Sequence, residues 1–156
     1  MYFNNGDRYE GDWRNNKKEG KGIYYFNKEP RKGDRYKGEW KLGKREGKRI
    51  YYHNNGNVYE GEWRNDKKEG KGIYYYNDGE RYEGDFRNGK MKGKGIYYFK
   101  SGNRYEGDWR NNNKKGKEIF YYHNGERLMG DYYKDNQIGK HVTLTINGVV
   151  EINNFE

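Results

Sequence analysis

Cysteine is absent from the 156-residue chain, which excludes disulfide bonds and thiolate metal ligands. Alanine is also absent, and proline occurs once, at Pro30. Leu, Ile, Val and Phe together number only 21, so an aliphatic core or a helical bundle is not expected. No apolar run approaches the length of a membrane span, and the N-terminus lacks the apolar segment of a signal peptide. These absences predict a cytoplasmic protein that is neither secreted nor transmembrane.

The chain is rich in aromatic residues and in charged residues of both signs. It contains 19 tyrosines, four tryptophans and 24 glycines, and 33 basic against 24 acidic residues give a formal net charge of +9. Aromatic rings bury a large area per residue, so they can take the place of the missing aliphatic side chains. Folded structure is therefore expected, although the aliphatic content is low enough to suggest disorder.

A ring, a charge and a glycine recur along the chain. The triplet begins at Tyr9, Tyr36, Tyr59, Tyr82 and Tyr105, with a degenerate copy at Leu128, and the spacings are 27, 23, 23, 23 and 23 residues. A second pattern, Gly-Lys-Gly-Ile and its variants, keeps the same step from Gly20 to Gly139. Two patterns in phase establish an internal repeat. Four extra residues in the first interval, around residues 29–32, predict an enlarged turn.

Each repeat contains two predicted strands, because the runs are short, rich in glycine and alternating. Alternation places rings and glycines on one face and charge on the other. In the third repeat the ring face carries Tyr59, Gly61, Trp63, Gly70, Gly72, Tyr74 and Tyr76. Pairs such as Asn55–Gly56 predict tight hairpins, and the other connection, residues 65–69, is expected to be longer and basic. If the strands pair antiparallel, a ring can cover the backbone beside a glycine, and we expect the glycine to make room for the tryptophan.

The motif Y-E-G-[ED]-W-x-N, followed by G-K-G-I-Y-x-[YF] and N-G at a 23-residue step, resembles the MORN repeat. The resemblance covers residues 2 to about 148 and implies an all-β fold, an elongated single-layer antiparallel β-sheet solenoid of tandem 23-residue hairpins. We predict a MORN array of about six repeats over residues 1–148, starting with a half-repeat. A C-terminal capping hairpin is predicted over residues 139–156, overlapping the last repeat. Local departures from the pattern occur at Phe86, Tyr132, Arg49, Glu118 and His141.

The sequence contains little that indicates a catalytic site. Ser101 is the only serine, and His53, His123 and His141 fall at different phases of the repeat. The carboxylates recur as a ladder, which is typical of a solvated face rather than of an acid–base pair. Gly-Lys-Gly lacks the spacing of a phosphate-binding loop. We expect no enzyme activity, no cofactor, no bound metal and no small-molecule substrate.

The rings are expected to follow one another along one face as a groove. They are either simply the core of a one-layer sheet, or part of the groove stays exposed and accepts a helix or extended segment of a partner. Both interpretations can hold, because a single layer cannot bury both of its faces. The predicted partner groove comprises Tyr36, Trp40, Tyr59, Trp63, Tyr82, Phe86, Tyr105 and Trp109.

Basic residues gather between the two strands of each repeat. Stacked hairpins would align them along one edge that attracts anionic lipids or acidic protein tails, or that only keeps the edge soluble. Nucleic acid is disfavoured as a partner, because acidic residues share the same strands. The predicted basic edge comprises Lys17, Lys18, Lys44, Arg45, Lys67, Lys68, Lys90, Lys92, Lys114 and Lys115.

The MORN resemblance implies ciliary axonemes and radial spokes, cytoskeletal structures, membrane junctions, and regulatory segments of enzymes as possible settings. The leading hypothesis is a non-enzymatic scaffold and protein-interaction module in a ciliary or cytoskeletal assembly, with self-association allowed. One alternative is a module that binds phosphoinositides or anionic membranes. Another is a regulatory MORN segment of a larger enzyme such as a lipid kinase.

Overall fold

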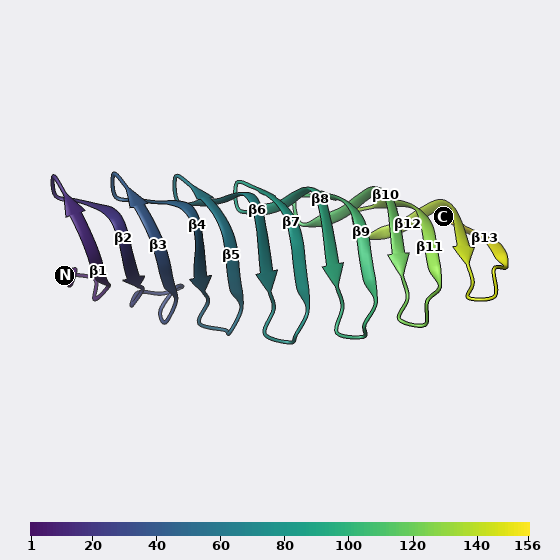
Figure 1. The fold of residues 1–156 in the computed structure, drawn as a ribbon, viewed down its shortest axis with the longest axis horizontal. Helices are drawn as coiled ribbons and strands as arrows, with labels where there is room; N and C mark the ends of the chain where they lie inside the picture. The colour runs from purple at the N-terminus through teal and green to yellow at the C-terminus, as the bar shows by residue number, and fades with distance from the viewer. The chain divides into compact units, whose positions relative to one another are not determined.

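The computed structural model describes residues 1–156 and contains thirteen β-strands and no helix. The predicted all-β, antiparallel fold is therefore confirmed (Figure 1). No segment forms a helix of the length and apolarity needed to cross a membrane. The strands are β1 (Arg8–Arg14), β2 (Lys17–Tyr25), β3 (Arg35–Lys41), β4 (Lys44–Tyr52), β5 (Val58–Arg64), β6 (Lys67–Tyr75), β7 (Arg81–Arg87), β8 (Lys90–Tyr98), β9 (Arg104–Arg110), β10 (Asn113–Tyr121), β11 (Arg127–Tyr133), β12 (Asn136–Leu144) and β13 (Val150–Phe155).

The chain forms two compact units. The first comprises residues 1–77 with 87–89, and the second comprises residues 78–86 with 90–156. In the first unit, β1 to β6 pair antiparallel in chain order. In the second unit, β8 to β13 pair in the same way. Each repeat therefore contributes one hairpin, as its two alternating segments predict.

Rings and glycines share one face of the paired strands, and this explains the abundance of glycine. In the β5–β6 pair, Tyr59 is opposite Tyr74 and Gly61 is opposite Gly72. A Cβ atom on Gly72 would lie 2.6 Å from the Tyr59 hydroxyl oxygen and 2.7 Å from its ring. Only glycine leaves room for the ring at this position, so the predicted covering of glycine by a ring is confirmed, but the ring is that of a tyrosine and not of the expected tryptophan.

The two kinds of connection are the reverse of the prediction. Between β5 and β6 the chain turns in two residues, Asn65 and Asp66, whose φ angles are 49° and 67°. Two left-handed residues match the twist of paired strands and make the tightest hairpin turn. The Asn-Gly connections are longer, for example residues 53–57 between β4 and β5. The enlarged turn around residues 29–32 is confirmed, because β2 and β3 are separated by residues 26–34.

A bulge near the start of β6 interrupts the alternation that the sequence suggests. Gly61 pairs with Gly72 and Trp63 pairs with Lys68, so residues 69–71 together face Glu62. Gly70 adopts φ = 66°, and a Cβ atom there would meet the Glu62 carboxylate. The prediction that Gly70 belongs to the ring face is therefore wrong, because a bulge changes which side chains point to each face. Lys68 lies opposite Trp63 on the ring face, which is also the face that alternation gives it.

Candidate functional site

The tyrosines that begin the repeats form the innermost layer of the ring face. Tyr9, Tyr36, Tyr59, Tyr82 and Tyr105 are each 0% exposed. Each hydroxyl donates a hydrogen bond of 2.9–3.1 Å to the backbone carbonyl three residues ahead. The polar end of each buried ring is thus satisfied. Burial raises the pKa of Tyr9 to about 12.

Rings from the far end of each first strand join successive repeats. In the first unit, the Trp40 ring centroid lies 5.2 Å from that of Tyr36 and 5.3 Å from that of Tyr9 in the preceding repeat. In the second unit, Trp109 lies 5.3 Å from Tyr105 and 5.0 Å from Tyr82. These pairs are nearly perpendicular, the edge-to-face arrangement that aromatic quadrupoles favour.

The eight predicted groove residues all lie in this inner layer. None is more than 5% exposed: Tyr36, Trp40, Tyr59, Trp63, Tyr82, Phe86, Tyr105 and Trp109. As they stand in the structure, these rings stabilise the sheet and offer little surface to a partner. Contact with the ring face therefore has to be made through the residues that cover them.

A second, half-buried layer of rings comes from the ends of the second strands. These rings stand in pairs two residues apart, such as Tyr74 and Tyr76, whose centroids are 4.8 Å apart. The half-buried members are Tyr24, His53, Tyr74, Tyr76, Tyr97, Phe99, Phe120 and Tyr122. The sequence reasoning did not select these residues, although ring pairs two residues apart ahead of every second connection were a visible signal.

Four basic side chains also lie over the ring face: Lys18, Arg45, Lys68 and Lys114. Each is the second residue of its strand, and alternation places it on the same face as the rings near the end of that strand. Lys68 Nζ is 4.3 Å from the Tyr74 ring centroid and 4.7 Å from that of Tyr59. Burial lowers the pKa of Lys18 and Lys68 to about 8, while the facing rings favour the charged form through cation–π attraction.

The residues of the predicted basic edge differ in their exposure to solvent. The exposed members are Lys17, Lys44, Lys67, Lys90 and Lys92, and the half-buried members are Lys18, Arg45, Lys68, Lys114 and Lys115. Lys17, Lys44, Lys67 and Lys90 each begin a second strand directly after a two-residue turn. The exposed members present their charge to solvent, whereas most of the half-buried ones lie against rings.

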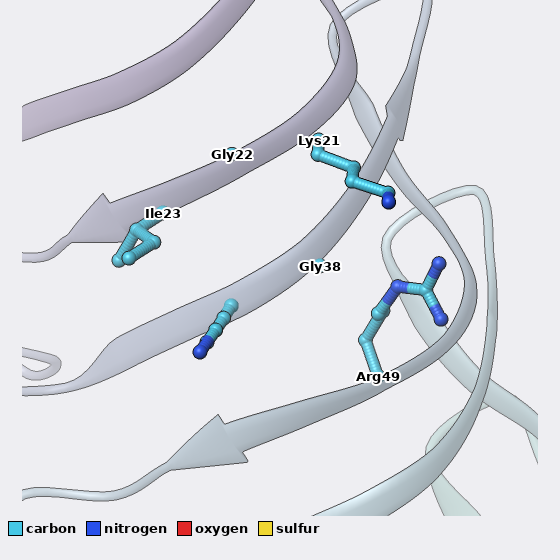
Figure 2. A pocket seen from close by; sticks show the side chains of 6 residues that line it. Lys21, Gly22, Ile23, Gly38 and Arg49 are labelled. Atoms are coloured by element: carbon cyan, nitrogen blue, oxygen red, sulfur yellow. The ribbon is translucent and has the colours of Figure 1, made fainter.

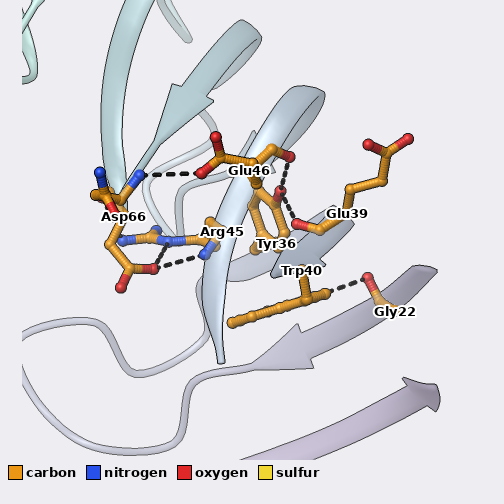
Figure 3. A network of polar contacts seen from close by, with 8 residues as sticks. Gly22, Tyr36, Glu39, Trp40, Arg45, Glu46 and Asp66 are labelled. Carbon is orange, nitrogen blue, oxygen red and sulfur yellow. Dashed lines mark hydrogen bonds and ion pairs between the residues drawn. The ribbon is translucent and has the colours of Figure 1, made fainter. Parts of the chain in front are cut away.

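Neighbouring turns in the first unit are hydrogen-bonded to one another (Figure 3). Asp66 Oδ1 accepts hydrogen bonds from the backbone N and the Nε of Arg45, both at 3.0 Å. The backbone N of Asn65 donates to Glu46 Oε2 at 3.2 Å. These bonds tie the β3–β4 turn to the β5–β6 turn and fix the spacing of the exposed lysines beside them.

A column of acid and amide side chains at the other end of the strands was missed by the sequence reasoning. Asp34 is buried, and its carboxylate accepts from the Tyr51 hydroxyl at 2.5 Å and from the backbone N of Asn54 at 2.8 Å. Its equivalents are Asp7, Asn57, Glu80 and Asn103, each accepting from a backbone N 20 residues later. The signal was a carboxylate or amide recurring at the repeat step just before each first strand. Within each unit these bonds join one connection between hairpins to the next.

The histidines do not share a site. His53 packs on the Tyr51 ring at 4.6 Å, and His123 is exposed. His141 is fully buried between Tyr132 and Phe155, with ring centroids 6.0 and 4.8 Å away. No group of three or more His, Cys, Asp or Glu side chains in residues 1–156 is arranged to hold a metal.

Glu118 and His141 form a buried polar pair in the second unit. Glu118 Oε1 lies 3.9 Å from His141 Nε2, beyond hydrogen-bond distance, and neither side chain makes a hydrogen bond. Both stand where other repeats have the second glycine of Gly-Lys-Gly. Burial raises the pKa of Glu118 to about 8, against the opposing effect of the Lys114 charge. The ionised carboxylate is therefore unfavourable in the folded state.

Replacing Glu118 with glutamine is expected to stabilise the protein near pH 8 and to change little near pH 4. The folded state keeps the Glu118 proton up to about pH 8, whereas the unfolded chain releases it near pH 4.5, so stability falls as the pH rises through this interval. Chemical denaturation at pH 8 should show a gain of roughly 1–3 kcal/mol for Glu118→Gln. Glu106→Gln, an exposed carboxylate, is the control. Equal effects of both variants would contradict the assignment.

Known proteins share this architecture. The MORN repeat family matches residues 9–29, 36–58, 59–81, 82–104 and 105–127. Among solved structures, the wild-type TCP10 domain of Danio rerio CPAP is similar with a TM-score of 0.62 and 14% identity, covering 99% of this chain and 72% of that one. The TCP10c domain of Drosophila melanogaster Sas-4 has a TM-score of 0.44 and 16% identity over 96% of this chain and 99% of that one. No curated protein matches the sequence.

The structural similarity at this level of identity shows a common fold and no more. The family matches, in contrast, cover five successive hairpins and most of the residues. Each match contains the tyrosine, the glycine and the second strand whose packing is described above. The chain belongs to the MORN repeat family.

Proposed function

We propose that this chain is a non-enzymatic scaffold that binds protein partners within a ciliary or cytoskeletal assembly. MORN repeats form a repeat module, and a module built almost entirely of them has surfaces rather than a catalytic cleft to offer. The turn-to-turn bonds and the Asp34 column keep neighbouring hairpins in fixed register. A rigid face with regularly spaced side chains suits the positioning of partners.

The division of the ring face into two layers carries this proposal. The inner rings are buried and hold the sheet, while the outer rings, such as Tyr74, remain half-buried with a basic side chain beside them. Aromatic rings with adjacent cations recognise extended or helical protein segments through apolar contact and charge. The outer layer, and not the eight inner rings, is the surface that we assign to partners.

Site-specific photo-crosslinking tests the assignment. A benzophenone-bearing phenylalanine at position 74 should capture cytoskeletal or axonemal proteins in ciliated cells. The same residue at position 75 is the matched control, because Tyr75 is the next residue and alternation places it on the opposite face. Adducts at position 74 alone would support the proposal. Equal adducts at both positions, or recovery of an uncrosslinked monomer with both, would refute it.

Binding to anionic membranes is the second candidate, because exposed Lys17, Lys44 and Lys67 stand at the same end of the strands in the first unit. Each lysine near an anionic surface contributes about 1 kcal/mol. Flotation with vesicles containing phosphatidylserine and phosphoinositides should then recover the protein at physiological salt. Binding that is lost on replacing the three lysines with glutamine would favour this candidate over the scaffold.

A further inference from the structure

A tyrosine ends each second strand from β2 to β10 on the face of the sheet that points away from the rings, here called the back face. The residue before it, for example Tyr24 of β2, belongs to the ring face, and side chains alternate along a strand. Figure 2 shows the alternation on β2, where Lys21 and Ile23 project to the same side. The back-face tyrosines are Tyr25, Tyr52, Tyr75, Tyr98 and Tyr121.

Four of these rings have an arginine over them. In each case the arginine begins the preceding strand, and its guanidinium carbon lies 4.0–4.3 Å from the ring centroid. This distance is within the range of cation–π attraction. The pairs are Arg8–Tyr25, Arg35–Tyr52, Arg81–Tyr98 and Arg104–Tyr121.

A glutamate completes this arrangement in three of the four cases. It lies two residues after the arginine on the same face, and its carboxylate forms an ion pair with the guanidinium at 2.9–3.7 Å. The guanidinium is thus held both by a ring and by a carboxylate. The ion pairs are Arg8–Glu10, Arg81–Glu83 and Arg104–Glu106.

The β5–β6 hairpin keeps the ring and the carboxylate but has no guanidinium. β5 begins with Val58, which is opposite Tyr75 in the register, just as Arg8 is opposite Tyr25. Tyr75 is 37% exposed, whereas the other back-face tyrosines are half-buried. Glu60 is exposed and forms no ion pair. Both groups that hold the arginine elsewhere are therefore accessible here.

The β1–β2 hairpin of the same unit is a nearly identical reference. β2 and β6 both have the sequence KKEGKGIYY. β1 and β5 differ at two positions, with Val58 in place of Arg8 and Glu62 in place of Asp12. The arginine is therefore the only charge that the strands of the first hairpin have and those of the third lack.

We propose that Tyr75 and Glu60 bind an arginine from an extended Arg-x-Arg segment of a partner protein. The guanidinium stacks on the Tyr75 ring and pairs with the Glu60 carboxylate, as Arg8 does in its own hairpin. Arginine suits this place better than lysine, because a planar guanidinium stacks on a ring while its N–H groups donate to a carboxylate.

A second carboxylate accounts for the second arginine of the segment. Glu62 lies two residues after Glu60 on the same face and forms no ion pair. Alternate residues of a strand are about 6.6 Å apart, and those of an extended peptide have the same spacing. The second arginine can therefore pair with Glu62 while the first occupies the place beside Tyr75.

The overall charge of the chain makes this proposal sharply testable. A formal net charge of +9 opposes the approach of any basic peptide. Saturable binding of such a peptide therefore requires local complementarity and does not follow from general attraction.

Titration of the full chain with an acetylated, amidated Arg-Gly-Arg peptide, followed by amide chemical shifts, tests the site. Saturable shifts are expected at Glu60 and Tyr75. Val58→Arg installs the residue with which the other first strands begin, so the fold is expected to tolerate it. Its own guanidinium then takes the place of the peptide's, and the affinity should fall roughly tenfold or more.

The same variant separates this site from the ring-face surface proposed for protein partners. Loss of peptide binding in Val58→Arg leaves crosslinking at position 74 unaffected, because that position lies on the other face. Position 75 belongs to the back-face site. The crosslinking comparison of positions 74 and 75 is therefore made in the Val58→Arg background, where the place of the arginine is already filled.

Val150→Arg is the matched control, because it makes the same substitution at an exposed valine of β13. It should leave the affinity for the peptide unchanged. A Lys-Gly-Lys peptide of equal charge should bind the wild type roughly threefold more weakly or worse, since it has no planar group to stack. Absence of saturable shifts, wild-type affinity in Val58→Arg, an equal loss in Val150→Arg, or equal binding of the two peptides would overturn the proposal.

Discussion

Replacing Tyr59 with alanine is expected to lower the free energy of unfolding by about 3–5 kcal/mol. The side chain is 0% exposed, covers Gly61 and Gly72, and packs at 5.6 Å against the Trp63 ring. The substitution leaves a cavity over two residues that have no side chains to fill it, and it removes the hydrogen bond to the Glu62 carbonyl. Urea denaturation followed by tryptophan fluorescence measures the loss.

Two further variants isolate the contribution of the Tyr59 ring to stability. Tyr75 is 37% exposed on the opposite face, so Tyr75→Ala is expected to cost less than about 1 kcal/mol. Tyr59→Phe keeps the ring and loses only the hydroxyl bond, which is expected to cost about 1 kcal/mol. If Tyr59→Ala were no more harmful than Tyr75→Ala, the ring could not be what covers the glycine backbone.

Unfolding at alkaline pH is the second large effect that we expect. Burial raises the pKa of Tyr9 and Tyr132 to about 12, and raises those of Tyr24, Tyr36, Tyr51, Tyr59 and Tyr105 further. The unfolded chain releases these protons near pH 10 while the folded state retains them, so stability falls as the pH rises above 10. Tyr9 and Tyr132 alone account for roughly 2–3 kcal/mol each by pH 12. Cooperative loss of β-structure together with tyrosinate absorbance between pH 10 and 12 is the expected observation.

The half-buried lysines act in the opposite direction at lower pH. Lys18 and Lys68 have a pKa of about 8 in the folded state against 10.5 in the unfolded chain, so folding is favoured as the pH rises from 8 to 10. The unfolding free energy should pass through a maximum near pH 10. Lys68→Met, which copies the residue at the equivalent position Met91, should reduce the rise. A monotonic fall from pH 8 onward would show that the lysines are not desolvated.

The repeat and its two faces could be predicted because both depend on local alternation and on the 23-residue step. The inner ring layer could be predicted from the sequence alone. Tyr59 lies two residues before Gly61 and Trp63 lies two residues after it, so alternation places all three on one face. The bulge could not be predicted in this way. Alternation assumes that each residue faces one residue of the neighbouring strand. Nothing in the composition of residues 69–71 indicates that all three face a single residue, Glu62.

The missed bulge and the misassigned turns together account for most of what the sequence reasoning misplaced. The bulge turned Gly70 toward Glu62, whereas Lys68 lies on the rings because the turn ends at Asp66 and Lys68 belongs to the strand. The turns were assigned from Asn-Gly pairs, which are strong hairpin signals, but Asn65 and Asp66 adopt the left-handed conformation as well. The burial of Glu118 and His141 follows from positions that are occupied by glycine elsewhere, and only the three-dimensional packing shows how little space is left around them.

The pairing of Trp40 with Tyr9 has a consequence for how the chain can be shortened. Each tryptophan completes the packing of the tyrosine in the repeat before it, so the smallest cooperative segment is longer than the sequence period and is out of phase with it. A truncation placed at the motif boundary ahead of Tyr36 would remove one of the two tryptophans that pack on the Tyr9 ring and leave only Trp13. Truncations that end just beyond a tryptophan keep that aromatic contact whole.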